Sequence, residues 1–185
     1  MVHISMLRML TRLDRTHGRR FLSSVIRVGS SLPLETKLET FVNGEKMERS
    51  VGEIFKGKNV AVCGVPGAFT PTCSDKHVPE YIKCLETYKT KGIETTCFAV
   101  NDAFVMKAWK KSLAAPEELI MLSDGNGTFA SQLGISMDTG GFGGLRSRRF
   151  AMYVEDGVVK VLNLEEGGAF TDKSSMLKLL DQIKE

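Results

Sequence analysis

Short apolar segments alternate with helix-like segments along most of the chain, and this alternation limits the fold more than any other feature. Residues 59–65 (NVAVCGV) form an apolar run typical of a strand. Asp156-Gly157 is a strong signal for a two-residue hairpin turn between two later strands. The predicted strands are 59–65, 95–100, 118–122, 150–155 and 158–164. Strands that alternate with helices predict an α/β fold, a central β-sheet flanked by helices on both faces.

The predicted helices carry their own start and end signals. Ser50 followed by Glu53 is a capping-box pattern, which would begin a short helix that ends near Phe55. The longest predicted helix runs from about Ser74 to Thr90 and is closed by Gly92. Further helices are predicted from Asn101 or Asp102 through Lys111, over 128–133, and from Asp172 or Ser174 to Ile183.

Charge is distributed unevenly between the first 33 residues and the rest of the chain. The 185 residues carry a net charge of +3. Residues 1–33 hold six arginines against the single acid Asp14, a net charge of +5, so the remainder carries −2. A nucleic-acid-binding surface needs clustered positive charge on the folded body, so no nucleic-acid partner is predicted. No apolar run is long enough to span a bilayer, and no membrane association is predicted.

The basic leader has the pattern of a targeting sequence. Met6, Met9, Leu10 and Leu13 recur at helical spacing, while the arginines lie on a different face and serines follow. This pattern predicts a mitochondrial-type transit peptide over residues 1–33, cleaved between Arg20 and Pro33, ahead of a single domain over residues 34–185. The matrix is the expected compartment, with a plastid-type organelle or the cytoplasm as alternatives. An ordinary surface helix or tail is the other interpretation of the leader.

Four cysteines without a CxxC pair do not form a disulfide framework, so the protein is expected in a reducing compartment. A metal site built from Cys73, His77 and Cys84 has poor spacing and lacks a fourth ligand. A calcium loop beginning at Asp124 fails because Ile135 stands where the bidentate acid belongs. No metal and no cofactor are predicted.

The most informative segment, residues 65–74 (VPGAFTPTCS), joins the end of a predicted strand to the start of the longest helix. Unpaired backbone N–H groups and the positive end of the helix dipole meet at such a helix start, so they favour the thiolate of Cys73. The helix end alone supplies about 1 to 2 kcal/mol, so an activated thiolate also requires a nearby cation.

Pro66, Thr70 and Cys73 match the PxxxTxxC motif, and through it the chain resembles the peroxiredoxins. The strings GVPGAFTPTCSDKHVPEY, VNDAFV and RRFAMYVEDGVVK are similar to the type II, peroxiredoxin-5-like group. The resemblance covers residues 34–185. It implies a thioredoxin-like fold with a central mixed β-sheet, reduction of hydrogen peroxide and alkyl hydroperoxides, and a homodimer.

The resemblance also assigns roles to individual residues. Cys73 attacks the peroxide and becomes a sulfenic acid, and Thr70 aligns the attack. Arg149 supplies the cation, in preference to its neighbours Arg146 and Arg148, and Pro66 shields the site from water. His77, one turn after Cys73, either tunes the pKa of the Cys73 thiol or packs against Tyr81, and packing is favoured.

The positions of the other cysteines bear on which thiol resolves the sulfenic acid. Animal relatives carry a resolving cysteine in the stretch that corresponds to residues 170–173, where this chain has none. Cys84 lies eleven residues along the helix, about 16 Å away, too far for a disulfide. Cys97 occupies the place of a thiol proposed to resolve in plant relatives, but it sits in a strand interior, and Cys63 is predicted to be core.

We therefore predict a one-cysteine cycle, in which glutathione with glutaredoxin, or thioredoxin, reduces Cys73 directly. Cys97 remains the alternative internal partner. A redox relay that passes oxidation from Cys73 to partner thiols is the alternative function.

Overall fold

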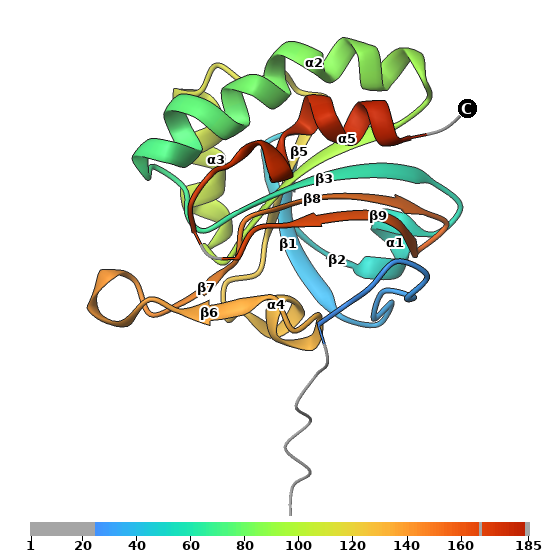
Figure 1. Cartoon of the computed structure of the whole chain (residues 1–185). Coiled ribbons are helices and arrows are strands. Elements are labelled where there is room, and N and C mark those ends of the chain that lie inside the picture. Colours follow the sequence, from blue (N-terminus) through green and yellow to red (C-terminus); the bar gives the residue numbers. More distant parts are fainter. Residues whose placement is uncertain (1–24, 167, 184–185) are drawn as a thin grey trace, which may run out of the picture.

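The central feature of the computed structural model, which describes residues 25–166 and 168–183, is a seven-stranded sheet (Figure 1). The strand order is β2-β1-β5-β4-β3-β8-β9, with β3, β4 and β5 parallel and the outer pairs antiparallel. The predicted α/β fold with a mixed central sheet is confirmed. The strands are β1 (Lys37–Val42), β2 (Glu45–Ser50), β3 (Asn59–Val65), β4 (Glu94–Ala99), β5 (Leu119–Ser123), β8 (Phe150–Glu155) and β9 (Val158–Leu164).

Helices cover both faces of this sheet (Figure 1). Alternate side chains of β3 explain how: Val60 and Val62 belong to one apolar cluster, whereas Ala61 and Cys63 belong to the other. The first cluster lies under the short helices α1 (Val51–Phe55) and α4 (Thr128–Gln132). The second lies under α2 (Val78–Thr90), α3 (Ala103–Ser112) and α5 (Met176–Gln182). No described helix is both long and apolar enough to cross a membrane.

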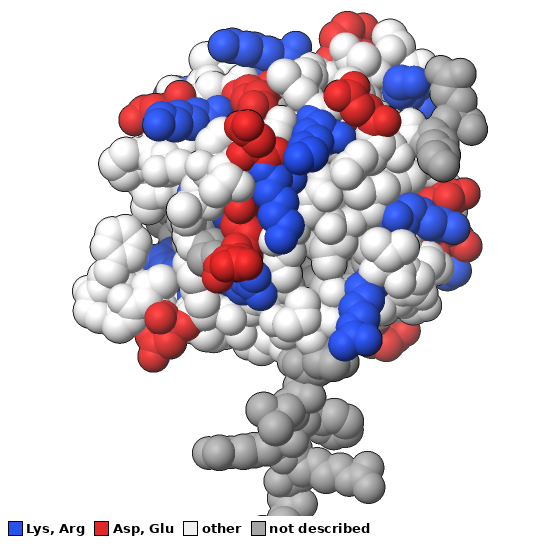
Figure 2. All heavy atoms as spheres, in the orientation of Figure 1, with Lys and Arg blue, Asp and Glu red and all other residues white. Residues whose placement is uncertain are grey.

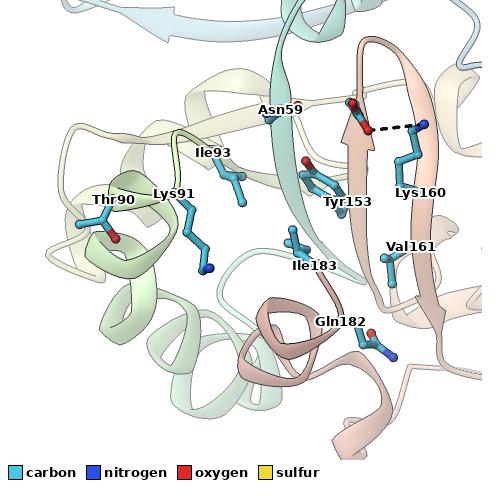
Figure 3. A pocket seen from close by; sticks show the side chains of 10 residues that line it. Asn59, Thr90, Lys91, Ile93, Tyr153, Lys160, Val161, Gln182 and Ile183 are labelled. Atoms are coloured by element: carbon cyan, nitrogen blue, oxygen red, sulfur yellow. Dashed lines mark ion pairs between the residues drawn. The ribbon is translucent and has the colours of Figure 1, made fainter. Parts of the chain in front are cut away.

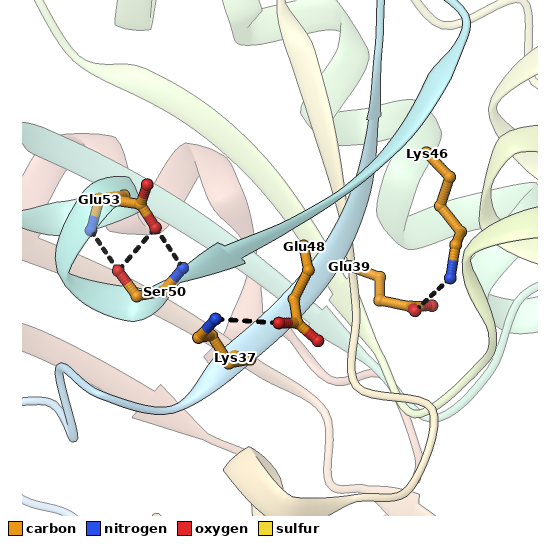
Figure 4. A network of polar contacts seen from close by, with 6 residues as sticks. All are labelled: Lys37, Glu39, Lys46, Glu48, Ser50 and Glu53. Carbon is orange, nitrogen blue, oxygen red and sulfur yellow. Dashed lines mark hydrogen bonds and ion pairs between the residues drawn. The ribbon is translucent and has the colours of Figure 1, made fainter.

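The β1–β2 hairpin was not predicted, although Asn43-Gly44 is a hairpin signal. Both turn residues have positive φ, 51° and 85°, which suits a type I′ turn. The strands escaped prediction because β2 (EKMERS) is largely charged and lies at the edge of the sheet. Cross-strand ion pairs Lys37–Glu48 and Lys46–Glu39 link β1 to β2 instead of buried apolar contacts (Figure 4).

The capping box at Ser50 is confirmed. Glu53 N donates to Ser50 Oγ over 3.2 Å, and Ser50 N donates to the Glu53 carboxylate over 2.6 Å (Figure 4). Two backbone donors at the start of α1 are thereby satisfied.

The helix predicted from Ser74 to Thr90 is present, but its first turn is not a regular α-helix, which was not predicted from the sequence. The helical backbone begins at Pro71, and residues Cys73–His77 form a widened π-helical turn before α2. Val78 N donates to the carbonyl of Cys73, five residues back. Pro79 explains the widening, because it has no N–H to donate to Asp75, and its ring displaces that carbonyl.

Gly64 is required for the packing of β3 against β8. It is paired with Phe150, and a Cβ atom at Gly64 would lie 2.0 Å from the Phe150 ring. Because Arg149 precedes Phe150, this contact also fixes the position of the arginine.

Residues ahead of Leu34 pack on the sheet. Ile26 N donates to the carbonyl of Leu133 over 2.8 Å, Leu32 N donates to that of Gly157 over 2.9 Å, and both side chains are buried. The folded unit therefore includes residues 25–33, which lie ahead of the predicted domain boundary at residue 34. The part of the predicted leader over residues 1–24 lies outside the described residues. The remaining elements are a two-stranded sheet of β6 (Ser136–Asp138) and β7 (Leu145–Ser147), and 3₁₀ turns at Gly140–Phe142 and Asp172–Ser174.

Candidate active site

The loop between β3 and the long helix holds Cys73 at the start of the helix. Ala68 N donates to Asn101 Oδ1 over 3.0 Å, and Thr70 Oγ1 donates to the carbonyl of Gly67 over 2.9 Å. The first bond of the helix runs from Ser74 N to the carbonyl of Thr70, 2.9 Å. Cys73 N–H therefore belongs to the helix start, where such donors have no partner within the helix.

Arg149, which is distant from Cys73 in the sequence, contacts its thiol in the fold. Its Nη2 lies 3.3 Å from Cys73 Sγ, although the two residues are 76 positions apart. Cys73 is fully buried, and Arg149 is 1% exposed. The dielectric is low at such a site, so the attraction between a guanidinium and a thiolate is stronger than in water.

The other partners of Arg149 are uncharged. Its Nε and Nη2 donate to the carbonyl of Gly168 over 3.1 and 2.9 Å, and its Nη1 donates to His77 Nδ1 over 3.1 Å. Among the described residues, no carboxylate lies within ion-pair distance of Arg149. The Arg149 guanidinium therefore faces the Cys73 sulfur with its positive charge not neutralised by a carboxylate of the described residues.

His77 is a neutral acceptor in this cluster. A carbonyl can only accept, so the 2.8 Å contact between His77 Nε2 and the Ser174 carbonyl places the proton on Nε2. Arginine can only donate, so Nδ1 carries the lone pair that Arg149 uses. Burial lowers the pKa of His77 to about 4, and the charge of Arg149 acts in the same direction.

The packing predicted between His77 and Tyr81 is not the main contact of the imidazole. The Phe170 ring lies against it at 4.7 Å between centroids. Tyr81 instead pairs with Tyr88 at 5.5 Å and donates its hydroxyl to the carbonyl of Ala61.

Residues 165–166 and 168–175 carry several of the groups around Arg149, and the sequence prediction missed them. Glu165 is 3% exposed, and its carboxylate accepts hydrogen bonds from the backbone and hydroxyl groups of Thr171 and Ser174. Burial raises the pKa of Glu165, but these four bonds more than offset it and lower the pKa. This carboxylate therefore folds the segment so that Gly168, Phe170 and Ser174 face Arg149 and His77.

The remaining predicted residues lie around this centre. Pro66 is buried, and a Cβ atom at Gly168 would lie 3.6 Å from its ring, so it borders the segment that holds Arg149. Arg146 donates to the carbonyls of Val100 and Gly143, and Arg148 donates to that of Glu165. Neither of these arginines hydrogen-bonds Cys73 within the described part of the chain.

The other three cysteines are buried thiols. Cys63 and Cys97 are paired in register on β3 and β4, and neither is exposed. Burial raises the pKa of Cys63 well above its usual range, with a hydrogen bond to Cys97 adding to the effect. Burial also raises the pKa of Cys84 to about 11. Among the described residues, no cluster of histidine, cysteine and acidic side chains could hold a metal ion.

A pocket of about 840 Å³ lies at the opposite end of the sheet (Figure 3). It is lined by Asn59 at the start of β3, whereas Cys73 follows the end of that strand. Its other lining residues include Tyr153 and the ion-paired Lys160, and none is a cysteine. Lysines, arginines and acids are interspersed over the face of the molecule in Figure 2.

The region that matches known proteins includes the sheet, its helices and the segment that carries Cys73. The Redoxin family matches residues 27–180. Peroxiredoxin-2E, chloroplastic, of Arabidopsis thaliana is 47% identical over 167 residues, 86% of this chain and 71% of that protein. Peroxiredoxin-2F, mitochondrial, of the same plant is 38% identical over 157 residues, 84% of this chain and 78% of that protein.

The fold has the same relatives. The crystal structure of reduced Prx3 in complex with H2O2 from Vibrio vulnificus matches with a TM-score of 0.79 at 43% identity, over 85% of this chain and 96% of that chain. The predicted thioredoxin-like fold is confirmed by this match. Together, the sequence and structural matches show that the chain belongs to the peroxiredoxins of the Redoxin family, in their type II group, and is a thiol peroxidase.

Proposed function

We propose that Cys73 is the peroxidatic nucleophile, acting on hydrogen peroxide and alkyl hydroperoxides. Its thiolate attacks one peroxide oxygen, the O–O bond breaks, and the second oxygen leaves as hydroxide or alkoxide, which takes up a proton. Cysteine is thereby oxidised to sulfenic acid while the peroxide is reduced. The observation that carries this proposal is the 3.3 Å contact between Arg149 Nη2 and Cys73 Sγ, in a site where no carboxylate of the described residues pairs with Arg149.

The neighbouring residues have physical tasks in this reaction. Thr70 Oγ1 donates to Gly67, which leaves its oxygen lone pairs as acceptors for a peroxide proton. Arg149 and Cys73 N–H stabilise the charge that develops on the peroxide oxygens. Pro66 limits the access of water.

For the reductive half, we propose a one-cysteine cycle. A thiol condenses with the sulfenic acid to give a mixed disulfide and water, and a second thiol then releases Cys73. Glutathione with glutaredoxin, or thioredoxin, supplies these thiols. The support is that Cys63, Cys84 and Cys97 are buried, and that residues 170–173 contain no cysteine. Cys97 as an internal resolving thiol is the alternative outcome.

The protein is proposed to act in an organelle as a homodimer after removal of its basic leader. The relatives include a chloroplastic and a mitochondrial protein, and the mitochondrial matrix is the first choice because the leader is rich in arginine. Ile26 is part of the apolar core, so cleavage between Arg20 and Val25 would leave the packed residues in place.

The proposal is tested by stopped-flow oxidation of the full chain with hydrogen peroxide, followed by intact mass with a sulfenic-acid trap. We expect rapid oxidation and one trapped adduct, both lost in Cys73→Ser and both retained in Cys97→Ser. Oxidation as slow as that of a free thiol would refute the peroxidase role of Cys73.

Two further outcomes distinguish the alternatives. A loss of two hydrogens in the wild type, with a trapped adduct only in Cys97→Ser, would identify Cys97 as the resolving residue. Slow turnover together with rapid mixed-disulfide formation to partner proteins would identify a relay.

A further inference from the structure

The peptide unit between Gly67 and Ala68 is hydrogen-bonded at both of its polar ends. Its N–H, on Ala68, donates to Asn101 Oδ1 over 3.0 Å. Its carbonyl, on Gly67, accepts from Thr70 Oγ1 over 2.9 Å. We propose that Asn101 is a positioning residue for the peroxidase reaction: it fixes this peptide unit and, through it, the direction in which the Thr70 hydroxyl points. The inference rests on the proposed roles of Cys73 and Thr70.

The chemistry of the partners fixes the direction of both hydrogen bonds. A backbone N–H can only donate, so the atom of Asn101 that faces Ala68 is its amide oxygen. A carbonyl can only accept, so the Thr70 hydroxyl donates its proton to Gly67 and keeps its lone pairs for a peroxide proton. An amide that donates through its N–H becomes a better acceptor at its carbonyl. Asn101 therefore strengthens the bond that orients Thr70 and also sets its direction.

The packing around Gly67 adds to this restraint. A Cβ atom there would lie 3.4 Å from Thr70 Cγ2, 3.5 Å from Arg146 Nη1 and 3.8 Å from Asn101 Oδ1. Arg146 is itself fixed, since its Nη1 donates to the carbonyl of Val100 over 2.8 Å. Both side chains thus pack against the loop near the end of β4. Among the described residues, only the side chain of Asn101 reaches from outside the loop to hydrogen-bond its backbone.

The loop needs this support because its backbone is strained next to Thr70. Phe69 has a φ of 60°, in the left-handed region that a bulky side chain rarely adopts. Its side chain is 55% exposed, so packing contributes little to holding it there. On one side of Phe69, Ala68 N donates to Asn101. On the other side, Ser74 N donates to the carbonyl of Thr70 over 2.9 Å. Loss of the Asn101 bond would therefore release the strained turn on one side.

Asn101 is itself held by the sheet and by a helix. It lies between β4 and α3, and its backbone carbonyl accepts a hydrogen bond from Ser123 Oγ at the end of β5. The next residue, Asp102, caps α3 by accepting from Phe104 N over 2.9 Å. The position of the half-buried amide is thus set by these elements and not by the loop that it supports.

Two substitutions of Asn101 differ in whether they keep the acceptor. Asn101→Leu has nearly the same shape but no acceptor for the Ala68 N–H, whereas Asn101→Asp keeps an acceptor oxygen. Asn126→Leu is the matched control, because Asn126 Oδ1 also accepts a backbone N–H, that of Thr128, over 3.1 Å ahead of α4. Urea midpoints of all three variants give the accompanying loss of stability.

The measurement is the rate constant for Cys73 oxidation by hydrogen peroxide in the full chain, together with a pH titration of the thiolate absorbance. Rates are compared above the end of each titration, so that the added charge of Asn101→Asp does not enter through ionisation. We expect Asn101→Leu to lose about tenfold in rate with an unchanged titration, because the contact between Arg149 and Cys73 is left in place. Asn101→Asp and Asn126→Leu should stay within about threefold of wild type.

A second background shows whether Asn101 acts through the Thr70 hydroxyl. Thr70→Val lacks that hydroxyl, so adding Asn101→Leu to it should change the rate by less than about twofold. The full tenfold loss in this background would overturn the inference and leave Asn101 a support of the loop as a whole.

Two other results would also overturn the inference. One is an unchanged rate in Asn101→Leu, and the other is a rate in Asn101→Asp no higher than in Asn101→Leu. If wild type itself shows no fast oxidation that depends on Cys73, the proposed function fails instead.

Discussion

At the scale of single residues, the site depends on an arginine that is buried without an ion-pair partner among the acids that the structure describes. Arg149 is 1% exposed, and its acceptors are a carbonyl, an imidazole and the Cys73 sulfur. An isolated buried positive charge is costly, so it depends on the hydrogen bonds that these three acceptors provide. The arrangement thus couples the burial of Arg149 to the reactivity of Cys73.

Replacing Arg149 by lysine keeps a positive charge but removes the planar fork. A single ammonium cannot serve the sulfur, Gly168 and His77 at once, and we expect the rate constant for Cys73 oxidation by peroxide to fall about a hundredfold. Stopped-flow kinetics measure the loss. Arg148→Lys is the matched control, because the Arg148 guanidinium donates to the Glu165 carbonyl and, among the described residues, contacts neither Cys73 nor His77 through a hydrogen bond. A variant of Arg149 within threefold of wild type would show that the fork is unnecessary.

At the scale of elements, the widened turn at Cys73–His77 brings the nucleophile and the histidine to one side of the helix. Its cause is local, because Pro79 removes the donor that a regular helix would use to bond Asp75. Both Cys73 and His77 are buried, while Asp75 and Lys76 between them are exposed. The turn therefore presents two functional side chains inward and two charged ones to solvent.

Replacing Pro79 by alanine should let this turn tighten. Alanine supplies an N–H for the Asp75 carbonyl, and the shift of Cys73 and His77 relative to Arg149 should lower the oxidation rate about tenfold without loss of stability. Peroxide kinetics and urea unfolding on the same samples check both parts. Pro116→Ala, in the loop before β5, serves as the control. An unchanged rate with a regular helix would contradict the role of the turn.

At the scale of the whole molecule, His77 ties the stability of the fold to pH. Its ordinary pKa of 6.5 falls to about 4 in the folded protein, so the unfolded chain binds more protons between these values. The contribution of His77 to the free energy of unfolding therefore rises with pH across this window. This contribution is lost as the pH falls toward 4. His77 is the one histidine in the described part of the chain.

The difference between the two pKa values amounts to about 3 kcal/mol, of which about 2 kcal/mol should be lost between pH 7 and pH 5. Urea unfolding of wild type and His77→Asn at both pH values measures this loss. The variant should lose less, because it lacks the titrating group, while Asp124, whose pKa burial raises, and Glu165, whose pKa is lowered, contribute equally to both. Identical pH dependence in the two proteins would show that His77 does not take up the proton.

The sequence by itself determined the apolar strands, the capping box at Ser50, the hairpin turn at Asp156-Gly157 and the place of Cys73 between β3 and a helix. These follow from periodicity and turn chemistry, which act over a few residues. It also carried the information for the Asn43-Gly44 hairpin and the turn ahead of Pro79, although the charged edge strand and the long helical pattern obscured both.

Only the tertiary structure decided which groups meet at the thiol. Arg149, Gly168 and Ser174 come from the far end of the chain, and the carboxylate of Glu165 folds the segment that carries two of them. Hydrogen bonds between residues 72 or more positions apart leave no periodic trace in a sequence, since they depend on how the sheet and its loops close in space. The neutral state of His77 has the same origin, because burial and the charge of Arg149 exist only in the folded protein.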